Sequence, residues 1–296
     1  MTTNNTPLLS PAFLRQLDRL SLLTRRAMVG ALQGERRSPR RGASVEFADF
    51  RPYTPGDDIR QIDWNLYARL ERVFLKLFVA EEELSIHLLL DTSGSMEWGE
   101  PNKFHYAKQV AAAFGYIALA NLDRVGVSSC ISDGSAAQLT SVRGKRGAIP
   151  LFHFLQNMTA RGSGDLAKIC RRYSQTARTP GPLLLCSDLF DAGWREALTA
   201  LASRNFEVTV MHILAPQERN PAIEGDFRLI DLEGGPSVEI SADLDLLRRY
   251  AQTLATWQSE IERFCHGRGM SYIQVDTAMP IEEFVLGRMR SQNVLK

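Results

Sequence analysis

Two short apolar segments, each leading to an aspartate, constrain the fold of this chain more than any other feature. Residues 84–90 lead to Asp91, and residues 182–187 lead to Asp188. A strand that is apolar on both faces is typical of a parallel sheet covered by helices on either side. Segments with helical spacing of apolar residues alternate with such strands, which is the pattern of a doubly wound fold. We therefore expect an α/β domain with a doubly wound, mostly parallel sheet over residues 80–296.

The periodicity of the apolar residues also predicts the individual elements of this domain. No internal repeat or low-complexity tract interrupts the alternation of strands and helices. In chain order we expect a strand at 84–90, a helix at 103–122, strands at 125–131 and 136–142, helices at 147–158 and 165–176, a strand at 182–187, a helix at 194–203, a strand at 206–214, a helix at 243–266 and a strand at 272–275.

The chain begins with a predicted helix and a basic loop. Ser10 followed by Pro11 is a favourable helix start, and the apolar spacing predicts a helix over residues 10–32. The loop at residues 35–42 is either a solvated connector or a contact surface for an acidic partner or for phosphates. Its positive charge comes from Arg36, Arg37, Arg40 and Arg41.

The next segment, residues 44–79, alternates apolar and polar residues in short pieces around a Thr-Pro-Gly-Asp-Asp turn at 54–58. This pattern favours small strands and turns. We expect residues 1–79 to form an N-terminal helix plus a small β-rich module that precedes the α/β domain of residues 80–296.

Charges of both signs lie close together in the small module. We expect several of them to pair with one another, and Trp64 to pack against the α/β domain; the alternative is a solvated charged surface. The charged residues concerned are Arg51, Asp57, Asp58, Arg60, Asp63 and Arg69.

The charge balance argues against some functions. The chain has 35 Lys and Arg residues against 34 Asp and Glu residues, a formal net charge of +1. Non-specific binding to nucleic acid needs a large basic excess, so no nucleic-acid partner is expected. Residues 1–79 contain 13 basic and 8 acidic side chains, whereas the remainder is mildly acidic. This asymmetry is consistent with two units that do different work.

Cysteine usage and hydropathy predict a cytoplasmic protein. The four cysteines are widely spaced and form no Cys-x-x-Cys pair, which is typical of reduced thiols. The first thirty residues lack the pattern of a signal peptide. The longest apolar stretch, residues 110–120, is too short to span a bilayer, so no integral membrane segment is expected.

A group of oxygen-bearing side chains follows the first apolar strand. Asp91, Ser93 and Ser95 alternate along one loop, and Gly94 permits the tight turn that would point their oxygens inward. At the same sheet edge, Asp188 would add a second carboxylate. An all-oxygen cluster of low charge suits Mg²⁺ and leaves a position for an outside ligand. The alternative is that Asp91 and Ser93 only cap the loop.

This Asp-x-Ser-x-Ser loop, with a strand-end aspartate about a hundred residues later, resembles the metal-ion-dependent adhesion site of von Willebrand factor A domains. A second resemblance lies upstream, in Gly42, Glu46-Phe47, the run from Arg51 to Trp64 and Ala68-Arg69. That stretch is similar to the signature of an uncharacterised bacterial family in which it directly precedes an A-type domain. Together the two resemblances cover about residues 40–191.

The resemblance implies a von Willebrand factor A-like fold with Asp91, Ser93, Ser95 and Asp188 as metal ligands. It also implies a role beside MoxR-type AAA+ ATPases, whose systems are thought to assemble or activate other protein complexes. No catalytic activity is attached to the family. The expected function is therefore a non-enzymatic adaptor for protein interaction that works with a MoxR-type AAA+ ATPase on an unknown client protein.

One position departs from the A-domain pattern. Such domains supply a threonine from a loop between the two acidic segments, and the corresponding stretch here is Gly162-Ser163-Gly164-Asp165-Leu166. Aligned on Asp-Leu, Gly164 takes the threonine position and has no side chain to offer. Ser163 and Asp165 are the further candidates for ligands. The expected site is thus incomplete, so that magnesium binding is weak or only the fold is retained.

Two other functions stay open. Asp91 followed by Thr-Ser-Gly-Ser resembles the nucleophile loop of haloacid-dehalogenase-like phosphatases, in which Asp91 would attack phosphorus beside Mg²⁺. Ser93 then stands where a general acid is expected and cannot serve as one near neutral pH. The second alternative is a structural A-type fold that binds partners without metal. The spacing of the histidines and glycines fits neither a zinc site nor a phosphate-binding loop.

Overall fold

The computed structural model describes residues 7–23, 45–80, 84–130, 137–162, 164–177, 179–230 and 237–296. The chain forms two compact units, and each is described by itself. Unit 1 joins Met1–Met28 to Leu84–Lys296, and unit 2 is Val29–Glu83. The sequence predicts one boundary, at residue 80, whereas the N-terminal helix groups with the α/β unit and not with the small module.

Unit 1 is built on a six-stranded sheet in the order β10-β7-β6-β3-β4-β5. All neighbouring strands are parallel except β5, which pairs with β4 in the antiparallel sense. The expected doubly wound, mostly parallel α/β sheet is confirmed. The strands are β3 (Ser85–Asp91), β4 (Arg124–Cys130), β5 (Gln138–Arg143), β6 (Pro182–Ser187), β7 (Glu207–Leu214) and β10 (Ser271–Asp276).

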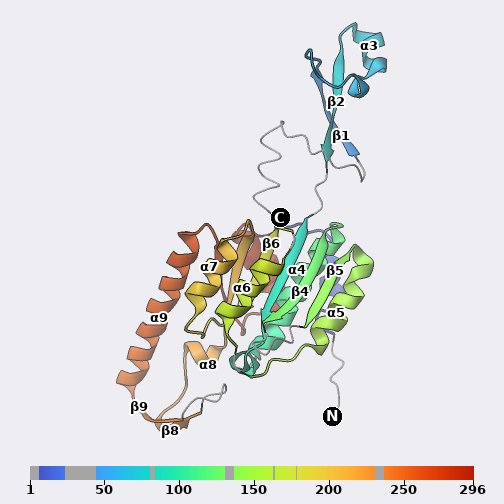
Figure 1. Cartoon of the computed structure of the whole chain (residues 1–296). Helices are drawn as coiled ribbons and strands as arrows, with labels where there is room; N and C mark the ends of the chain where they lie inside the picture. Colours follow the sequence, from blue (N-terminus) through green and yellow to red (C-terminus); the bar gives the residue numbers. More distant parts are fainter. Residues whose placement is uncertain are drawn as a thin grey trace. The chain divides into compact units, whose positions relative to one another are not determined.

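Helices cover both faces of this sheet, and in Figure 1 α6 and α7 lie over the near face. Side chains of the central strand alternate between two cores: Leu88 and Leu90 pack with α4 and α5, whereas Leu89 packs with α6, α7 and α9. Burial on both sides explains why Leu88, Leu89 and Leu90 are apolar at three consecutive positions. The helices are η2 (Gly94–Glu97), α4 (Lys103–Ala120), η3 (Lys145–Gly147), α5 (Ala148–Asn157), α6 (Leu166–Thr176), α7 (Trp194–Ala202) and α9 (Leu244–His266).

The N-terminal helix α1 (Pro11–Leu17) is shorter than the periodicity predicts. Ser10 caps it as expected, its side chain accepting a hydrogen bond from the amide of Phe13. The chain then pairs with the C-terminal end: Leu22 bridges Leu295, and the Ser21 amide donates to the carbonyl of Lys296 at 3.1 Å. This pairing ends the helix, and residues 24–32 of the expected helix lie outside the described residues.

The C-terminal end packs into the same core as α1. It contains α10 (Ile281–Glu283), the π-helix η4 (Phe284–Arg288) and α11 (Met289–Ser291). Phe284 and Met289 are buried beside α1 and α4. Among the described helices of both units, none is long and apolar enough to cross a membrane.

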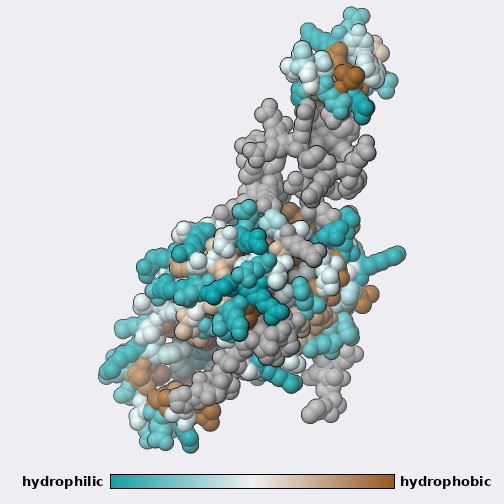
Figure 2. Space-filling view, viewed as in Figure 1, coloured by the Kyte–Doolittle hydropathy of each residue, from teal (hydrophilic) through white to brown (hydrophobic). Residues whose placement is uncertain are grey.

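Three further elements of unit 1 were not expected from the sequence: α8 (Pro216–Arg219) and the hairpin of β8 (Gly225–Leu229) with β9 (Val238–Ala242). Apolar side chains gather over this hairpin and the adjoining end of α9 (Figure 2). Phe227, Leu229, Val238 and Leu244 are all exposed. The strands are five residues each, too short for a clear period of two.

Unit 2 is an antiparallel pair, β1 (Val45–Pro52) and β2 (Phe74–Ala80), with η1 (Ile59–Gln61) and α3 (Trp64–Leu70) between them. The expected small strands and turns are confirmed, and α3 is an addition. The two strands pair from Val45 with Ala80 to Pro52 with Phe74.

The charges of unit 2 pair in part, as expected. Arg51 forms a two-pronged ion pair with Asp57, with N–O distances of 2.7 and 2.8 Å. Asp58 and Asp63 cap short helices, accepting hydrogen bonds from backbone amides. Trp64 is 62% exposed and meets Tyr67 edge-on. Its packing against the α/β domain stays a prediction.

Substitution at the cap of α3 should separate capping from charge. The carboxylate of Asp63 accepts from the amides of Asn65 and Leu66 at 2.9 and 3.1 Å. Asp63→Ala should cost about 1 kcal/mol of local stability, whereas Asp63→Asn keeps an accepting oxygen and should cost less. Hydrogen exchange of the α3 amides measures this. Equal protection in Asp63→Ala and the wild type would contradict it.

Candidate functional site

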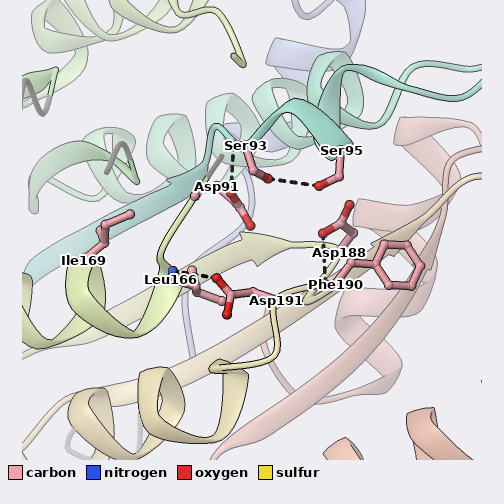
Figure 3. Close-up of a pocket in the computed structure, with 9 residues that line it drawn as sticks. Asp91, Ser93, Ser95, Leu166, Ile169, Asp188, Phe190 and Asp191 are labelled. Carbon is pink, nitrogen blue, oxygen red and sulfur yellow. Dashed lines mark hydrogen bonds between the residues drawn. The ribbon is translucent and has the colours of Figure 1, made fainter. Parts of the chain in front are cut away.

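The two strand-end aspartates come together at the point where the strand order reverses. From β3 the chain moves to β4 on one side, and from β6 it moves to β7 on the other, while β3 and β6 are neighbours. Ligands of open α/β sheets bind at this place, beyond the carboxyl ends of the strands. Asp91 is the last residue of β3 and Asp188 directly follows β6. Both line one small pocket (Figure 3).

Hydroxyl and carboxylate oxygens form one side of this pocket. Asp91 is 4% exposed and accepts from the Ser93 amide at 3.0 Å and from the Ser187 hydroxyl at 2.6 Å. Oγ of Ser93 lies 3.0 Å from Oγ of Ser95. The complete lining is Asp91, Ser93, Ser95, Gly164, Leu166, Ile169, Asp188, Phe190 and Asp191.

The structure shows how far loop capping accounts for these residues. Asp91 does close its loop, through the amide of Ser93. Ser93 stands at the N-cap of η2, but its side chain makes no capping hydrogen bond. Its hydroxyl lines the pocket beside Ser95 instead. Capping therefore accounts for one contact of Asp91 and leaves the two hydroxyls facing the pocket.

Burial determines the electrostatics of Asp91. Loss of water around its carboxylate, and next the charge of Asp188, raise the pKa of Asp91 to about 6. Hydrogen bonds from Ser187 and Ser93 oppose the rise without cancelling it. Among the three aspartates that line the pocket, Asp91 and Asp188 thus repel each other when both are charged, an arrangement that a cation would stabilise.

The loop before α6 closes the pocket from a third side. The amide of Gly94 donates to the carbonyl of Gly162 at 2.7 Å, and the amide of Arg161 donates to that of Thr92 at 2.8 Å. A Cβ atom on Gly164 would lie 3.3 Å from Cβ of Ser93 and 3.9 Å from Oδ1 of Asp91. Position 164 therefore faces the site, as expected for the missing threonine, and supplies no oxygen.

The two further ligand candidates on this loop fare differently. Ser163 lies outside the described residues. Asp165 is exposed and caps α6, accepting from the amide of Lys168 at 2.8 Å, and it does not line the pocket. The carboxylate of Asp165 thus caps the start of α6, and its place among the ligands stays a prediction. Asp191 lines the pocket in its stead and accepts from the amides of Leu166 and Gly193.

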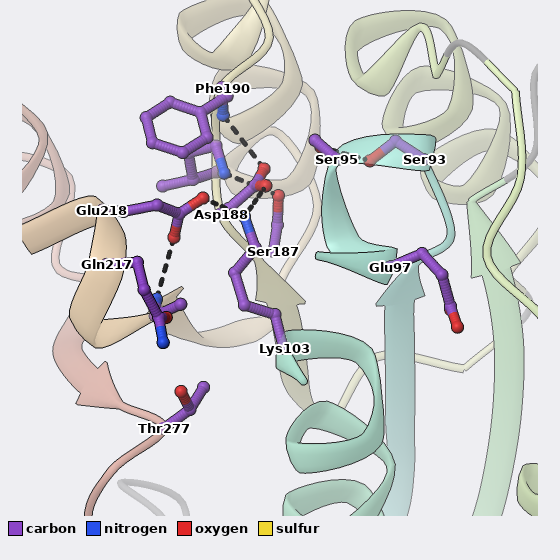
Figure 4. A network of polar contacts seen from close by, with 12 residues as sticks. Ser93, Ser95, Glu97, Lys103, Ser187, Asp188, Phe190, Gln217, Glu218 and Thr277 are labelled. Atoms are coloured by element: carbon purple, nitrogen blue, oxygen red, sulfur yellow. Dashed lines mark hydrogen bonds and ion pairs between the residues drawn. The ribbon is translucent and has the colours of Figure 1, made fainter. Parts of the chain in front are cut away.

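A buried lysine that the sequence analysis missed stands directly behind Asp188 (Figure 4). Lys103 is 0% exposed, and its Nζ lies 2.7 Å from Oδ2 of Asp188 and 2.5 Å from Oε1 of Glu218. The other oxygen of Asp188 accepts from the Phe190 amide at 3.2 Å. The second oxygen of Glu218 accepts from the Ala215 amide at 2.8 Å.

One local signal could have identified Lys103. It is the first residue of α4, where the positive end of the helix dipole disfavours a cation. A residue that contradicts the local preference of its element often marks a functional or strained position. Its partners Asp188 and Glu218 are 85 and 115 positions away, so the sequence could not name them.

The described donor set does not fit a complete magnesium site. Asp91, Ser93 and Ser95 face the pocket with oxygen ligands, as the cation requires. However, Gly164 offers no oxygen, and the charge of Asp188 is already neutralised by Lys103. Among the described residues, no three His, Cys, Asp or Glu side chains are grouped to hold a metal ion. Magnesium binding stays a prediction, and the expected affinity is low.

Comparison with known proteins gives relatives without an assigned function. The "Uncharacterized protein Mb1516" of Mycobacterium bovis and the "Uncharacterized protein Rv1480" of Mycobacterium tuberculosis are each 28% identical over 291 residues, which is 95% of this chain and 91% of theirs. An uncharacterised bacterial family was expected from residues 42–69, and these relatives agree with it.

Two solved structures are similar to this chain. The conserved hypothetical protein BatB from Bacteroides thetaiotaomicron matches with a TM-score of 0.43 and 17% identity, over 71% of this chain and 98% of that one. The pilus adhesin SpaC from Lactobacillus rhamnosus GG matches with a TM-score of 0.44 and 12% identity, over 73% and 31%. The family described as "Protein of unknown function DUF58" matches residues 49–261, and the chain therefore belongs to this family.

Proposed function

We propose that this chain is a non-enzymatic adaptor whose pocket at the carboxyl edge of the sheet binds a partner protein. The observation that carries the proposal is the meeting of Asp91, Ser93, Ser95 and Asp188 at the reversal of strand order. The strand order with one antiparallel edge strand, together with the Asp-x-Ser-x-Ser loop, supports a von Willebrand factor A-like domain. A MoxR-type AAA+ ATPase is the first partner we propose, from the resemblance of residues 42–69; the client is unknown.

The rim of the pocket has the composition of a protein contact site. Phe190 lines the pocket, is 47% exposed, and stacks on Trp257 with 5.1 Å between ring centroids. Aromatic residues of this kind dominate binding energy when a partner covers them. The serine hydroxyls and carboxylate oxygens beside Phe190 would supply orientation and specificity through hydrogen bonds.

Loss of the pocket hydroxyls should weaken partner binding without unfolding the chain. For Ser93→Ala/Ser95→Ala we expect affinity for a MoxR-type AAA+ ATPase to fall about tenfold, since truncation of the few residues at the centre of an interface costs more than about 1 kcal/mol. Surface plasmon resonance measures this, with Ser203→Ala as the control, because the hydroxyl of that exposed serine donates to the carbonyl of Ala200 and does not line the pocket.

A second arm of the same experiment separates the basic loop from the pocket. Charge reversal of Arg36, Arg37, Arg40 and Arg41, which lie outside the described residues, should slow association at low salt. The effect should fade toward physiological salt, where screening shortens to about 8 Å. If neither the serine pair nor the arginines alter binding at any salt concentration, the recognition proposal is wrong.

The phosphatase alternative predicts a different result. It requires Asp91 as the nucleophile, and both oxygens of Asp91 are already engaged by hydrogen bonds at 3.0 and 2.6 Å. Mg²⁺-dependent hydrolysis of a generic aryl phosphate that Asp91→Asn abolishes would overturn the adaptor proposal in favour of an enzyme.

A further inference from the structure

The full burial of Lys103 requires an explanation that the proposed function does not give. Removal of an ammonium group from water is strongly unfavourable unless acidic groups surround it. Two carboxylates do so here, from Asp188 after β6 and from Glu218 in α8. The ring of Phe190 lies over the same nitrogen, 5.2 Å from Nζ to the ring centroid. The site is therefore built around a fixed positive charge.

Each acidic partner of Lys103 is itself held in place. The amide of Phe190 donates to Asp188 at 3.2 Å, and the amide of Ala215 donates to Glu218 at 2.8 Å. The hydroxyl of Tyr250 donates to the backbone carbonyl of Glu218 at 2.6 Å, which ties α9 to α8. The ammonium thus has a defined position against the wall of the pocket that Asp188 and Phe190 line (Figure 4).

We propose that the ammonium of Lys103 permanently supplies the positive charge that a divalent cation would otherwise supply at Asp188, so that the pocket works without metal. Two separate features agree with this. Asp188 directs one oxygen to Nζ, and Gly164 removes the oxygen that a side chain at its position would add. A pocket with an internal cation has no need of that oxygen.

The charge balance explains why the ammonium and a metal ion exclude each other. A divalent cation at Asp188 would lie close to Nζ, and two positive charges at such short range repel strongly in a site with little water. Removal of the lysine charge leaves Asp188 and Glu218 without their counter-charge, and Asp188 shares the pocket with Asp91. The variant chain should then take up a divalent ion from solution.

The test is a titration of the whole chain with Mn²⁺, followed by calorimetry and by the electron paramagnetic resonance signal of free Mn²⁺. We expect Lys103→Met to bind Mn²⁺ at least tenfold more tightly than the wild type. Lys108→Met is the matched control, because Lys108 lies on the same helix and its ammonium contacts the Met158 carbonyl and the Phe104 ring, with no ion pair to an acid among the described residues. This control should bind as the wild type does.

Two more variants locate the ion and identify what limits its binding. Lys103→Met/Asp188→Asn should lose the gain, since the freed carboxylate is the proposed ligand. Gly164→Thr, with Lys103 intact, adds an oxygen but keeps the ammonium and should gain little. Equal binding by the wild type and Lys103→Met would overturn the inference. So would a gain in Gly164→Thr without one in Lys103→Met, or a gain that survives Asp188→Asn.

If Lys103→Met does not fold, a second variant still tests the inference. Lys103→Met/Glu218→Gln removes one of the two acids left without a partner, and it keeps Asp188 as a ligand. It should show the same gain in Mn²⁺ affinity, and the absence of any gain there overturns the inference. The inference concerns the same pocket as the proposed function. It rests on the proposed function only for the role of that pocket in binding a partner. The titrations contain no partner protein, so a failure of ATPase binding leaves their outcome unchanged.

Discussion

Lys103→Met is expected to lower the free energy of unfolding by about 3–5 kcal/mol in buffer without divalent cations, because it leaves buried acids without their counter-charge. Asp188 and Glu218 both pair with the lysine, and Asp188 is 1% exposed. Urea denaturation at pH 7 measures the loss. Lys108→Met, whose side chain pairs with no acid in the described contacts, should lose much less.

A double-mutant cycle separates the ion pair from the packing of the lysine chain. Lys103→Met/Asp188→Asn should recover part of the loss, since the second substitution removes one of the unpaired charges. If the double variant is as unstable as the sum of the two single variants, the acid and the lysine do not interact as their 2.7 Å separation implies.

Asp91→Asn is expected to stabilise the chain at neutral pH by roughly 1–3 kcal/mol, although it removes a residue of the pocket. The folded chain holds the pKa of Asp91 at about 6, above the 3.8 of an aspartate exposed to water. A raised pKa means that the stability associated with this group is complete below pH 4 and is lost as pH rises through 6. The neutral asparagine avoids this loss.

The stability difference should therefore depend on pH. It should be largest at pH 7.5 and should shrink as the pH falls to 4.5, where Asp91 in the wild type is itself protonated. Asp57→Asn provides the opposite case, because the Arg51 ion pair lowers the pKa of Asp57 and its contribution is lost as pH falls. Urea midpoints at both pH values test the prediction, and a difference that does not change with pH would contradict it.

Local sequence was enough to predict the sheet and half of the pocket. The strand residues 88–90 and 183–186 are apolar because both faces are buried, so their place at the centre of the sheet follows from hydropathy. Residues that end such strands meet at one edge whatever the details of packing. Asp91 and Asp188 could therefore be brought together before the structure was known.

What sequence could not predict depends on contacts between distant parts of the chain. The helix expected over residues 10–32 ends at Leu17, because residues 21–23 pair with the last three residues of the chain. The apolar periodicity of one segment carries no information about tertiary pairing that competes with helix formation. The pairing of Lys103 with Glu218 also could not be predicted, since α8 is a four-residue helix with no apolar periodicity that would indicate it in the sequence.

The position of unit 2 in the chain, between two parts of unit 1, has a consequence for how the protein can diversify. Before unit 2, the carbonyl of Leu20 accepts from the side chain of Asn121; after it, the amide of Leu84 donates to Asp123. Leu20 and Leu84, which precede and follow unit 2 in the chain, thus both bond to residues at the end of α4. In the sequence, unit 2 is an insertion within unit 1. Its sequence can drift, lengthen or be exchanged while the strand order, the N-terminal pairing and the ammonium-centred pocket of unit 1 stay as they are.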